Sequence, residues 1–216
     1  MNILLIANSS EIGGGNRSLE LLALGLRAKG FGVLIVLPQS GPIEESLKAN
    51  ELDVLVQPCY SISLSNVKKS VVGTYSWVQI IRQYNIDIVH ANGCGQARSV
   101  SFAAKLKRIP VICHVRFLMN DNYLRWVFRF VPKPNCFIYV SQSLADDVIP
   151  VFKSCGIRSK NFIIHNAVVV SDREIVYRDE EIKNVGMVAN FQEFKGHEDF
   201  IYMAKLLAKT NNNLMF

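Results

Sequence analysis

Short apolar runs that alternate with helix-periodic segments constrain the fold of this chain most strongly. Runs rich in β-branched residues lie at 2–7, 32–38, 52–57, 87–91, 110–115, 136–141 and 161–165. Apolar residues recur between them at helical spacing, namely Leu19, Leu22, Ala23 and Leu26, then Val67, Val71, Val78 and Ile81, then Leu144, Ala145, Val148, Ile149 and Phe152. Apolar strands interleaved with helices are typical of a parallel sheet covered on both faces. The sequence therefore predicts an α/β fold with a Rossmann-like, doubly wound parallel sheet over residues 1–167.

The alternating pattern breaks once and then restarts. Residues 168–183 carry mixed charges without a clean period, which predicts a linker or a crossing strand. A strand is expected at residues 184–190, followed by a helix from about His197 to Lys209. Residues 184–216 are too few to fold unaided, because isolated domains need about 40 residues or more. We therefore expect one complete domain, a linker, and the incomplete start of a second domain.

Composition narrows the class of protein. Apolar residues make up 50% of the chain and charged residues 19%, so it can bury a core and is neither disordered nor a disulfide scaffold. The five cysteines are scattered without metal-site spacing, which favours a reduced, cytoplasmic protein. Residues 1–7 lack the basic start of a signal peptide, and no run reaches the ~18 apolar residues of a membrane span.

Three glycines stand between the first strand and the first helix. Gly13, Gly14 and Gly15 let backbone N–H groups approach a ligand, and a helix N-terminus attracts anions. A phosphate or a sugar hydroxyl fits there, beside Asn16 and Arg17. The loop lacks the last glycine of G-x-G-x-x-G and the lysine of a P-loop, which disfavours both of those nucleotide sites. The alternative is a tight turn that binds nothing.

Polar side chains also follow several later strands. His90, His114 and Arg116 lie near the ends of two strands, where ligands of open α/β sheets bind, although core histidines are the alternative. Lys195 precedes a predicted helix and can hold a phosphate, or can be a solvated turn lysine. No G-x-S-x-G surrounds Ser141, which disfavours serine hydrolysis. No carboxylate pair is placed to bind a metal ion, so none is expected.

Residues 115–133 alternate basic and aromatic side chains. Such a segment can lie on an anionic bilayer face. The alternative is an ordinary amphipathic helix that packs its aromatic residues inward. Because no RNA-binding signature accompanies the segment, nucleic acid is not an expected partner, and the net charge of +6 is assigned to phosphate and membrane contacts.

Several segments, taken in order, resemble the start of a family-4 glycosyltransferase of the GT-B fold. They are GGGNRSLELLALGLRAKGFGV, DIVHANG, IPVICHVR, FIYVSQSLADDV, FIIHNAV and VGMVANFQEFKGHEDFIYMAKLL. In that family two Rossmann-like domains face each other, the first holding the acceptor and the second the nucleotide-sugar. The resemblance implies a retaining transfer that uses no metal or other cofactor. The implied acceptor is lipid-linked or a polysaccharide, at the inner face of the cell membrane.

The resemblance also implies roles for single residues. Gly14 and Gly15 would line the cleft near the donor, and Arg116 takes a position where many members carry a histidine near the reacting sugar. Lys195 matches the lysine that neutralises the leaving diphosphate, which is electrostatic stabilisation. Asn166 matches the asparagine at the end of the first domain. His114 is a second catalytic candidate, and His90, Ser141 and Asn190 are further cleft candidates.

The chain also departs from the family pattern. Asn190 stands where the family has an arginine, and Ala167 where it has a glycine. The E-x7-E segment that binds the donor in the family is absent from this sequence. We therefore expect weak or no transferase activity from these 216 residues by themselves. The rival interpretations are a non-catalytic truncated or split-gene module that binds acceptor, membrane or a partner, and, more remotely, a nucleotide-dependent oxidoreductase.

Overall fold

The structure is a computed structural model that describes residues 1–169, 184–189, 191, 193–210 and 213–216. It divides into two compact units, Met1–Val169 and Val170–Phe216, which are taken separately below. Most of the predicted linker, residues 170–183, lies outside the described residues. Among the described helices, none is long and apolar enough to cross a membrane.

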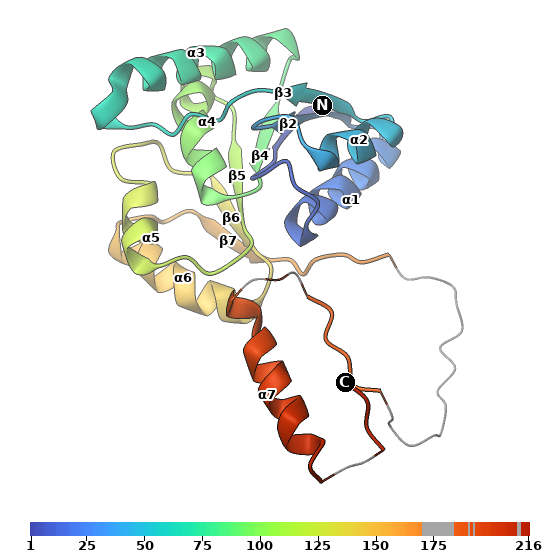
Figure 1. The fold of residues 1–216 in the computed structure, drawn as a ribbon. Helices are drawn as coiled ribbons and strands as arrows, with labels where there is room; N and C mark the ends of the chain where they lie inside the picture. The colour runs from blue at the N-terminus through green and yellow to red at the C-terminus, as the bar shows by residue number, and fades with distance from the viewer. Residues whose placement is uncertain (170–183, 190, 192, 211–212) are drawn as a thin grey trace. The chain divides into compact units, whose positions relative to one another are not determined.

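A seven-stranded parallel sheet forms the centre of the first unit (Figure 1). Its strands are β1 (Asn2–Ile6), β2 (Gly32–Leu37), β3 (Asp53–Val56), β4 (Ile88–Ala91), β5 (Val111–Val115), β6 (Cys136–Tyr139) and β7 (Lys160–Ile163). The strand order is β3-β2-β1-β4-β5-β6-β7, and all neighbouring pairs are parallel. The predicted strands and the predicted Rossmann-like parallel sheet are therefore confirmed.

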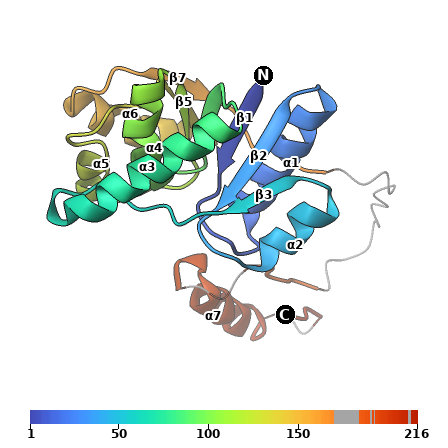
Figure 2. The ribbon, with the colours of Figure 1, turned by 90° about the horizontal axis from the view of Figure 1, so that it is seen from above.

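Helices flank the sheet in two layers (Figure 2). They are α1 (Gly14–Ala28), α2 (Pro42–Ala49), α3 (Val67–Gln83), α4 (Cys94–Lys107), α5 (Asp121–Val127) and α6 (Gln142–Ser154). Because successive strand residues point to opposite faces, Leu4 of β1 joins the cluster that contains Trp77 of α3. Leu5 joins the other cluster with Leu19 of α1. The first unit thus has one core on each side of its sheet.

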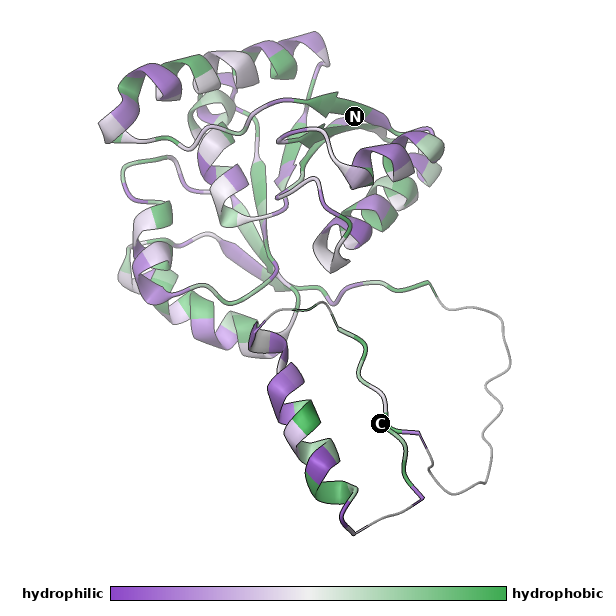
Figure 3. Cartoon of the chain, in the orientation of Figure 1, coloured by the Kyte–Doolittle hydropathy of each residue, from purple (hydrophilic) through white to green (hydrophobic). Residues whose placement is uncertain are grey.

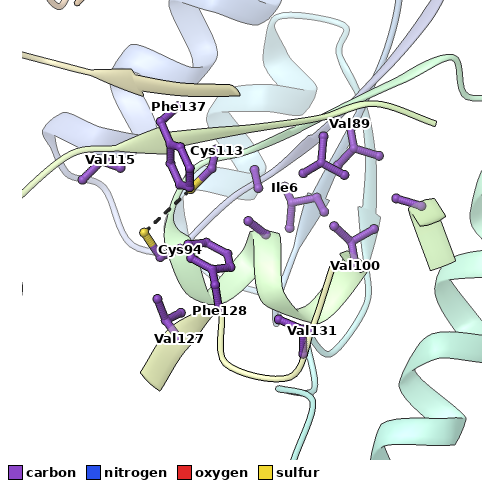
Figure 4. Packing of buried hydrophobic residues seen from close by; sticks show 14 of the residues in the cluster. Ile6, Val89, Cys94, Val100, Cys113, Val115, Val127, Phe128, Val131 and Phe137 are labelled. Carbon is purple, nitrogen blue, oxygen red and sulfur yellow. Dashed lines mark hydrogen bonds between the residues drawn. The ribbon is translucent and has the colours of Figure 1, made fainter. Parts of the chain in front are cut away.

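The larger core contains two cysteines that touch (Figure 4). The thiol of Cys113 on β5 donates a hydrogen bond to the sulfur of Cys94 on α4, at a sulfur–sulfur distance of 3.7 Å. Burial raises the pKa of the Cys113 thiol well above its ordinary value. Both side chains therefore serve as small core residues beside Phe137, in the reduced form.

Helix α3 buries only part of the face that its spacing predicts: Ile81 is in the core and Val78 packs against it. Val67 and Val71, which we expected to be buried, are 59% and 62% exposed. Gly73, Trp77 and Ile80 are buried instead. The large indole of Trp77 buries more apolar surface than a valine, and this outweighs the regular spacing of the valines. Two apolar stripes therefore run along α3, and only one of them packs inside.

Strand β7 also differs from the prediction of a sheet covered on both faces. All four of its residues are exposed, and Phe162 is 48% exposed. In a parallel sheet each strand is covered by the helices that precede and follow it. Within residues 1–169 no helix follows β7, so this edge strand has less helical cover than the inner strands.

The second unit contains the predicted helix but not the predicted strand. Helix α7 (His197–Leu207) follows the 3-10 turn η2 (Glu193–Lys195). Gly196 joins them at a φ of 74°, a left-handed conformation that favours glycine. Among the described residues 184–189, only Asn184 makes a β-bridge, to Met215. The strand predicted at 184–190 is wrong there, because a single bridge provides no ladder of backbone hydrogen bonds.

Candidate functional site

The topology of the sheet places a crevice between β1 and β4. The connection from β1 runs to α1 on one side of the sheet, and the connection from β4 runs to α4 on the other. Ligands of open α/β sheets bind at such a switch point, beyond the carboxyl ends of the strands. Gly15 lies there, because a Cβ atom on it would be 4.0 Å from the side-chain nitrogens of both Asn8 and Asn92. The predicted glycine loop is thus at the switch point.

Arg116, which follows β5, reaches into this crevice. Its Nε donates a hydrogen bond to Oδ1 of Asn92, and one terminal nitrogen donates to Ser18 Oγ at 2.9 Å and to Asn166 Oδ1 at 2.7 Å. The other terminal nitrogen is buried and has no hydrogen-bond partner among the described residues. Burial lowers the pKa of Arg116 to about 10, so the guanidinium stays charged at neutral pH. Its hydrogen-bond partners are all neutral, and within the described part of the chain no carboxylate forms an ion pair with it.

Asn92 connects Arg116 to the glycine loop. It is fully buried, and its amide nitrogen donates to the backbone oxygen of Gly15 at 3.2 Å while its oxygen accepts from Arg116. A Cβ on Gly15 would also lie 3.7 Å from Cδ of Arg116, so the backbone and this side chain approach closely. Neither Asn92 nor Ser18 was singled out from the sequence. The available signal was the position of Asn92, directly after a strand at the switch point.

Helix α1 begins at Gly14, and its N-cap Gly13 makes no side-chain hydrogen bond to the helix. A Cβ on Gly14 would meet no atom within 4 Å, so the space beside the first turn is open. The N–H groups of a first helical turn and the helix dipole both favour an anion. The start of α1 therefore adds positive potential next to Arg116.

The two residues after the glycines make other contacts in the structure. The amide of Asn16 donates to the backbone oxygens of Ser9 and Glu11, and thereby shapes the loop before α1. Arg17 pairs with buried Glu20 at 2.6 Å and donates to Ser46 of α2. The proposed phosphate contacts of Asn16 and Arg17 stay predictions, and the structure does not bring their side chains to Arg116.

Burial alone would raise the pKa of the Glu20 carboxyl. Hydrogen bonds from Ser46, Arg17 and Asn50, together with the charge of Arg17, outweigh burial and hold this pKa below its ordinary value. A charged Glu20 therefore ties α1 to α2. The guanidinium of Arg17 is committed to that structural contact.

His90 and His114 form a buried pair on adjacent strands. Nδ1 of His114 lies 3.3 Å from Nε2 of His90, and the two rings meet edge to face. Burial and then the charge of Arg116 lower the pKa of His90 to about 4 and that of His114 to about 3. Both imidazoles are therefore neutral at pH 7. Nε2 of His114 is buried without a hydrogen-bond partner among the described residues.

A cavity of about 300 Å³ joins the predicted residues. It is lined by His114, Arg116 and Asn166, by Ser18, and by apolar residues of α1 such as Leu22. Lys29 and His165 also line it, so the walls combine basic and imidazole side chains and amide and hydroxyl groups with an apolar surface. Such a mixture suits a ligand that carries both negative charge and hydroxyl groups.

The neutral histidine pair predicts a pH dependence of stability. Unfolded imidazoles titrate near ~6.5, whereas His114 stays neutral in the fold down to about 3. The unfolded state therefore binds more protons below ~6.5, and stability falls as the pH falls. Between pH ~6.5 and ~4.5 the unfolding free energy should fall by about 2 kcal/mol more in the native chain than in His114→Gln.

Urea denaturation at a series of pH values measures this difference. His165→Gln is the matched control, because His165 is exposed. Parallel pH profiles for the native chain and His114→Gln would contradict a buried neutral His114.

Ser141 and Lys195 belong to other elements of the two units. Ser141 is the N-cap of α6, and its hydroxyl accepts a hydrogen bond from the Leu144 amide. Lys195 is exposed in η2 of the second unit, directly before the helix that it was predicted to precede. Asn190 lies outside the described residues.

Residues 115–133 do not form one continuous helix. Only α5 is helical, and Leu124, Val127 and Phe128 are buried in the core as the inward-packing alternative predicts. Arg116 belongs to the cavity, whereas Trp126 is 44% exposed. A membrane contact through this segment stays a prediction.

Several solved structures with a similar fold are GT-B glycosyltransferases. A glycosyltransferase from Rickettsia africae aligns with a TM-score of 0.73 over 100% of this chain and 59% of that chain, at 16% identity. HepE of Anabaena, solved with UDP-glucose, aligns with a TM-score of 0.59 over 98% and 50% of the two chains, at 18% identity. The lipopolysaccharide outer core galactosyltransferase WaaB aligns with a TM-score of 0.61 over 85% and 51%, at 14% identity. The fold is thus that of GT-B glycosyltransferases, and the chain spans about half the length of these relatives.

The sequence profile of Glycosyltransferase Family 4 matches residues 12–172. The chain belongs to this family, which confirms the resemblance drawn from its motifs. None of the curated proteins matches the chain.

Proposed function

We propose that this chain forms the acceptor-side half of a retaining glycosyltransferase, with the first residues of the donor side. The glycosyltransferase to which this half belongs transfers a sugar from a nucleotide-sugar to a lipid-linked or polysaccharide acceptor at the cytoplasmic face of the membrane. HepE was solved with UDP-glucose, which supports a uridine diphosphate sugar as the first donor to test. WaaB is a lipopolysaccharide galactosyltransferase, which supports a saccharide acceptor.

The charge of Arg116, held only by neutral hydrogen-bond partners, is the observation that carries this proposal. The leaving diphosphate gains negative charge as the bond to the sugar breaks, and a preorganised cation stabilises that charge. Arg116 is held by Asn92, Ser18 and Asn166, which orient the guanidinium without neutralising it. In this proposal a cation of the protein itself supplies the neutralisation, and the family resemblance gives the same role to Lys195 of the second unit.

His114 serves in this proposal as a hydrogen-bonding group and not as a proton donor. Its pKa of about 3 leaves the imidazole neutral, and one ring nitrogen already faces His90. The buried Nε2 is available to a hydroxyl of a bound sugar in the same cavity as Arg116. His114 would then orient the sugar while Arg116 stabilises the developing charge.

Thermal-shift titration with a panel of nucleotide-sugars tests the proposal. We expect UDP-sugars to raise the melting temperature, to the same extent with and without EDTA. Lys195→Ala should reduce the shift, whereas Lys209→Ala, which removes another exposed lysine of the second unit, should preserve it. If no nucleotide-sugar stabilises the native chain, the proposed donor binding is wrong.

A further inference from the structure

An apolar groove lies between α3 and α4, and none of its lining residues belongs to the candidate site. Its volume is about 470 Å³. The apolar lining residues are Ile62, Val71, Tyr75, Val78, Phe102 and Leu106. The groove is bounded by the outward stripe of α3, of which Val71 and Tyr75 lie outside both core clusters.

The walls of the groove stand well out of the surface. Val71, Tyr75 and Leu106 are 62%, 64% and 70% exposed. The stripe continues along the chain to Leu64 and Val67, which are 79% and 59% exposed, and apolar residues recur along α3 in Figure 3. Contiguous apolar surface of this kind marks an interaction site on a soluble protein.

The sequence around the groove is almost free of acidic residues. From Val54 to Asn120 the only acidic residue is Asp87, whereas the same stretch holds the basic residues Lys68, Lys69, Arg82, Arg98, Lys105, Lys107, Arg108 and Arg116. Residues three apart on a helix are neighbours, so Lys68 lies beside Val71 and Lys105 beside Phe102. Exposed lysines therefore flank the apolar stripe on both helices.

Two of these lysines stand where a helix normally avoids them. Lys68 and Lys69 lie in the first turn of α3, which carries no acidic residue. The helix dipole makes a cation there unfavourable, with effects of about 0.3–1 kcal/mol per charge. The placement of these lysines therefore does not stabilise the helix, but it favours contact with a negatively charged partner.

We propose that the α3–α4 groove docks this protein on an anionic lipid bilayer. Its apolar walls enter the boundary between headgroups and acyl chains, and the flanking lysines contact lipid phosphates. A bilayer fits better than a peptide in the groove because the apolar side chains project outward along the length of α3. The surface is separate from the proposed transfer site and moves the expected membrane contact from residues 115–133 to α3 and α4.

Vesicle flotation tests the surface without any transfer reaction. The native chain should float with vesicles of phosphatidylcholine and phosphatidylglycerol, and much less with phosphatidylcholine alone. Val71→Glu should weaken binding by about tenfold or more, because it places a charge in the apolar boundary. Lys68→Gln and Lys105→Gln should each weaken binding by about fivefold. Val168→Glu makes the same substitution at a 77% exposed valine outside the groove and should bind like the native chain.

If Val71→Glu melts at the same temperature as the native chain, the exposed substitution leaves the fold intact. The inference is overturned if the native chain does not bind anionic vesicles, or if Val71→Glu binds them as tightly as the native chain. The native chain could instead sediment as a dimer that Val71→Glu dissociates, and bind no vesicles. That result would also overturn the inference, because it assigns the groove to a second copy of the chain. None of these outcomes bears on nucleotide-sugar binding, so the two proposals fail separately.

Discussion

Arg98→Met is expected to lower the free energy of unfolding of the first unit by about 3 kcal/mol, the largest stability effect that we predict. Arg98 is 5% exposed on α4. It donates to the backbone oxygens of Ile62 at 2.8 Å and Val127 at 2.6 Å, and its guanidinium lies 4.3 Å from the ring centre of Trp126. The carbonyl groups at a helix C-terminus lack intrahelical donors, so Arg98 supplies a hydrogen bond to the end of α5. The same side chain links α5 to the loop before α3.

Methionine keeps much of the arginine stem and removes its donors, so buried carbonyls lose their partners. Urea denaturation followed by the fluorescence of Trp77 and Trp126 measures the change. Arg125→Met is the matched control, because that side chain is about half exposed and its ion pair with Asp121 is 3.8 Å long. We expect this control to change stability by no more than about 0.5 kcal/mol. Equal effects of the two substitutions would contradict a structural role for Arg98.

Arg116→Met is expected to weaken nucleotide-sugar binding by about 10- to 100-fold, the largest functional effect that we predict. The reason is the loss of the guanidinium that lines the cavity and that is held only by neutral hydrogen-bond partners. Arg116→Lys should bind with intermediate affinity, because lysine keeps the charge but loses the fork that bridges Asn92 and Asn166. Isothermal titration with the best donor from the thermal-shift panel measures both affinities.

Each variant must be shown to fold before the affinities are compared. Arg125→Met again removes a guanidinium, from an exposed position, and should bind the donor as the native chain does. Retention of full donor affinity in Arg116→Met would remove Arg116 from the donor site and leave the family assignment untouched.

The sheet was predictable because each of its strands is a short apolar run, and buried parallel strands require such runs on both faces. The buried face of α3 was predictable only in part. Ile81 packs inward as its spacing predicts, but only tertiary packing decides that Trp77 points inward and Val71 does not. The strand expected at residues 184–190 failed for a related reason. Strand formation depends on a neighbouring strand, which lies outside the local pattern.

The candidate site was predictable where topology dictates position. His114, Arg116 and Asn166 all follow or end parallel strands, and such ends meet at one edge of the sheet, so their shared cavity follows from the strand pattern. Asn92 and Ser18 were missed because single neutral residues carry no motif. Glu20, the ion-pair partner of Arg17, also accepts hydrogen bonds from Ser46 and Asn50 in the region of α2. This contact between distant segments could not be predicted from the glycine loop.

The most direct measurement is the NMR signal of the Arg116 guanidinium during titration with a nucleotide-sugar. The signal would be assigned by its loss in Arg116→Lys, and the signal of Arg125 would serve as the internal reference. We predict that the Arg116 signal moves with the nucleotide-sugar and not with the uncharged nucleoside, while the Arg125 signal stays in place. An unchanged Arg116 signal at donor concentrations that stabilise the protein would contradict the proposal that this cavity binds the donor diphosphate.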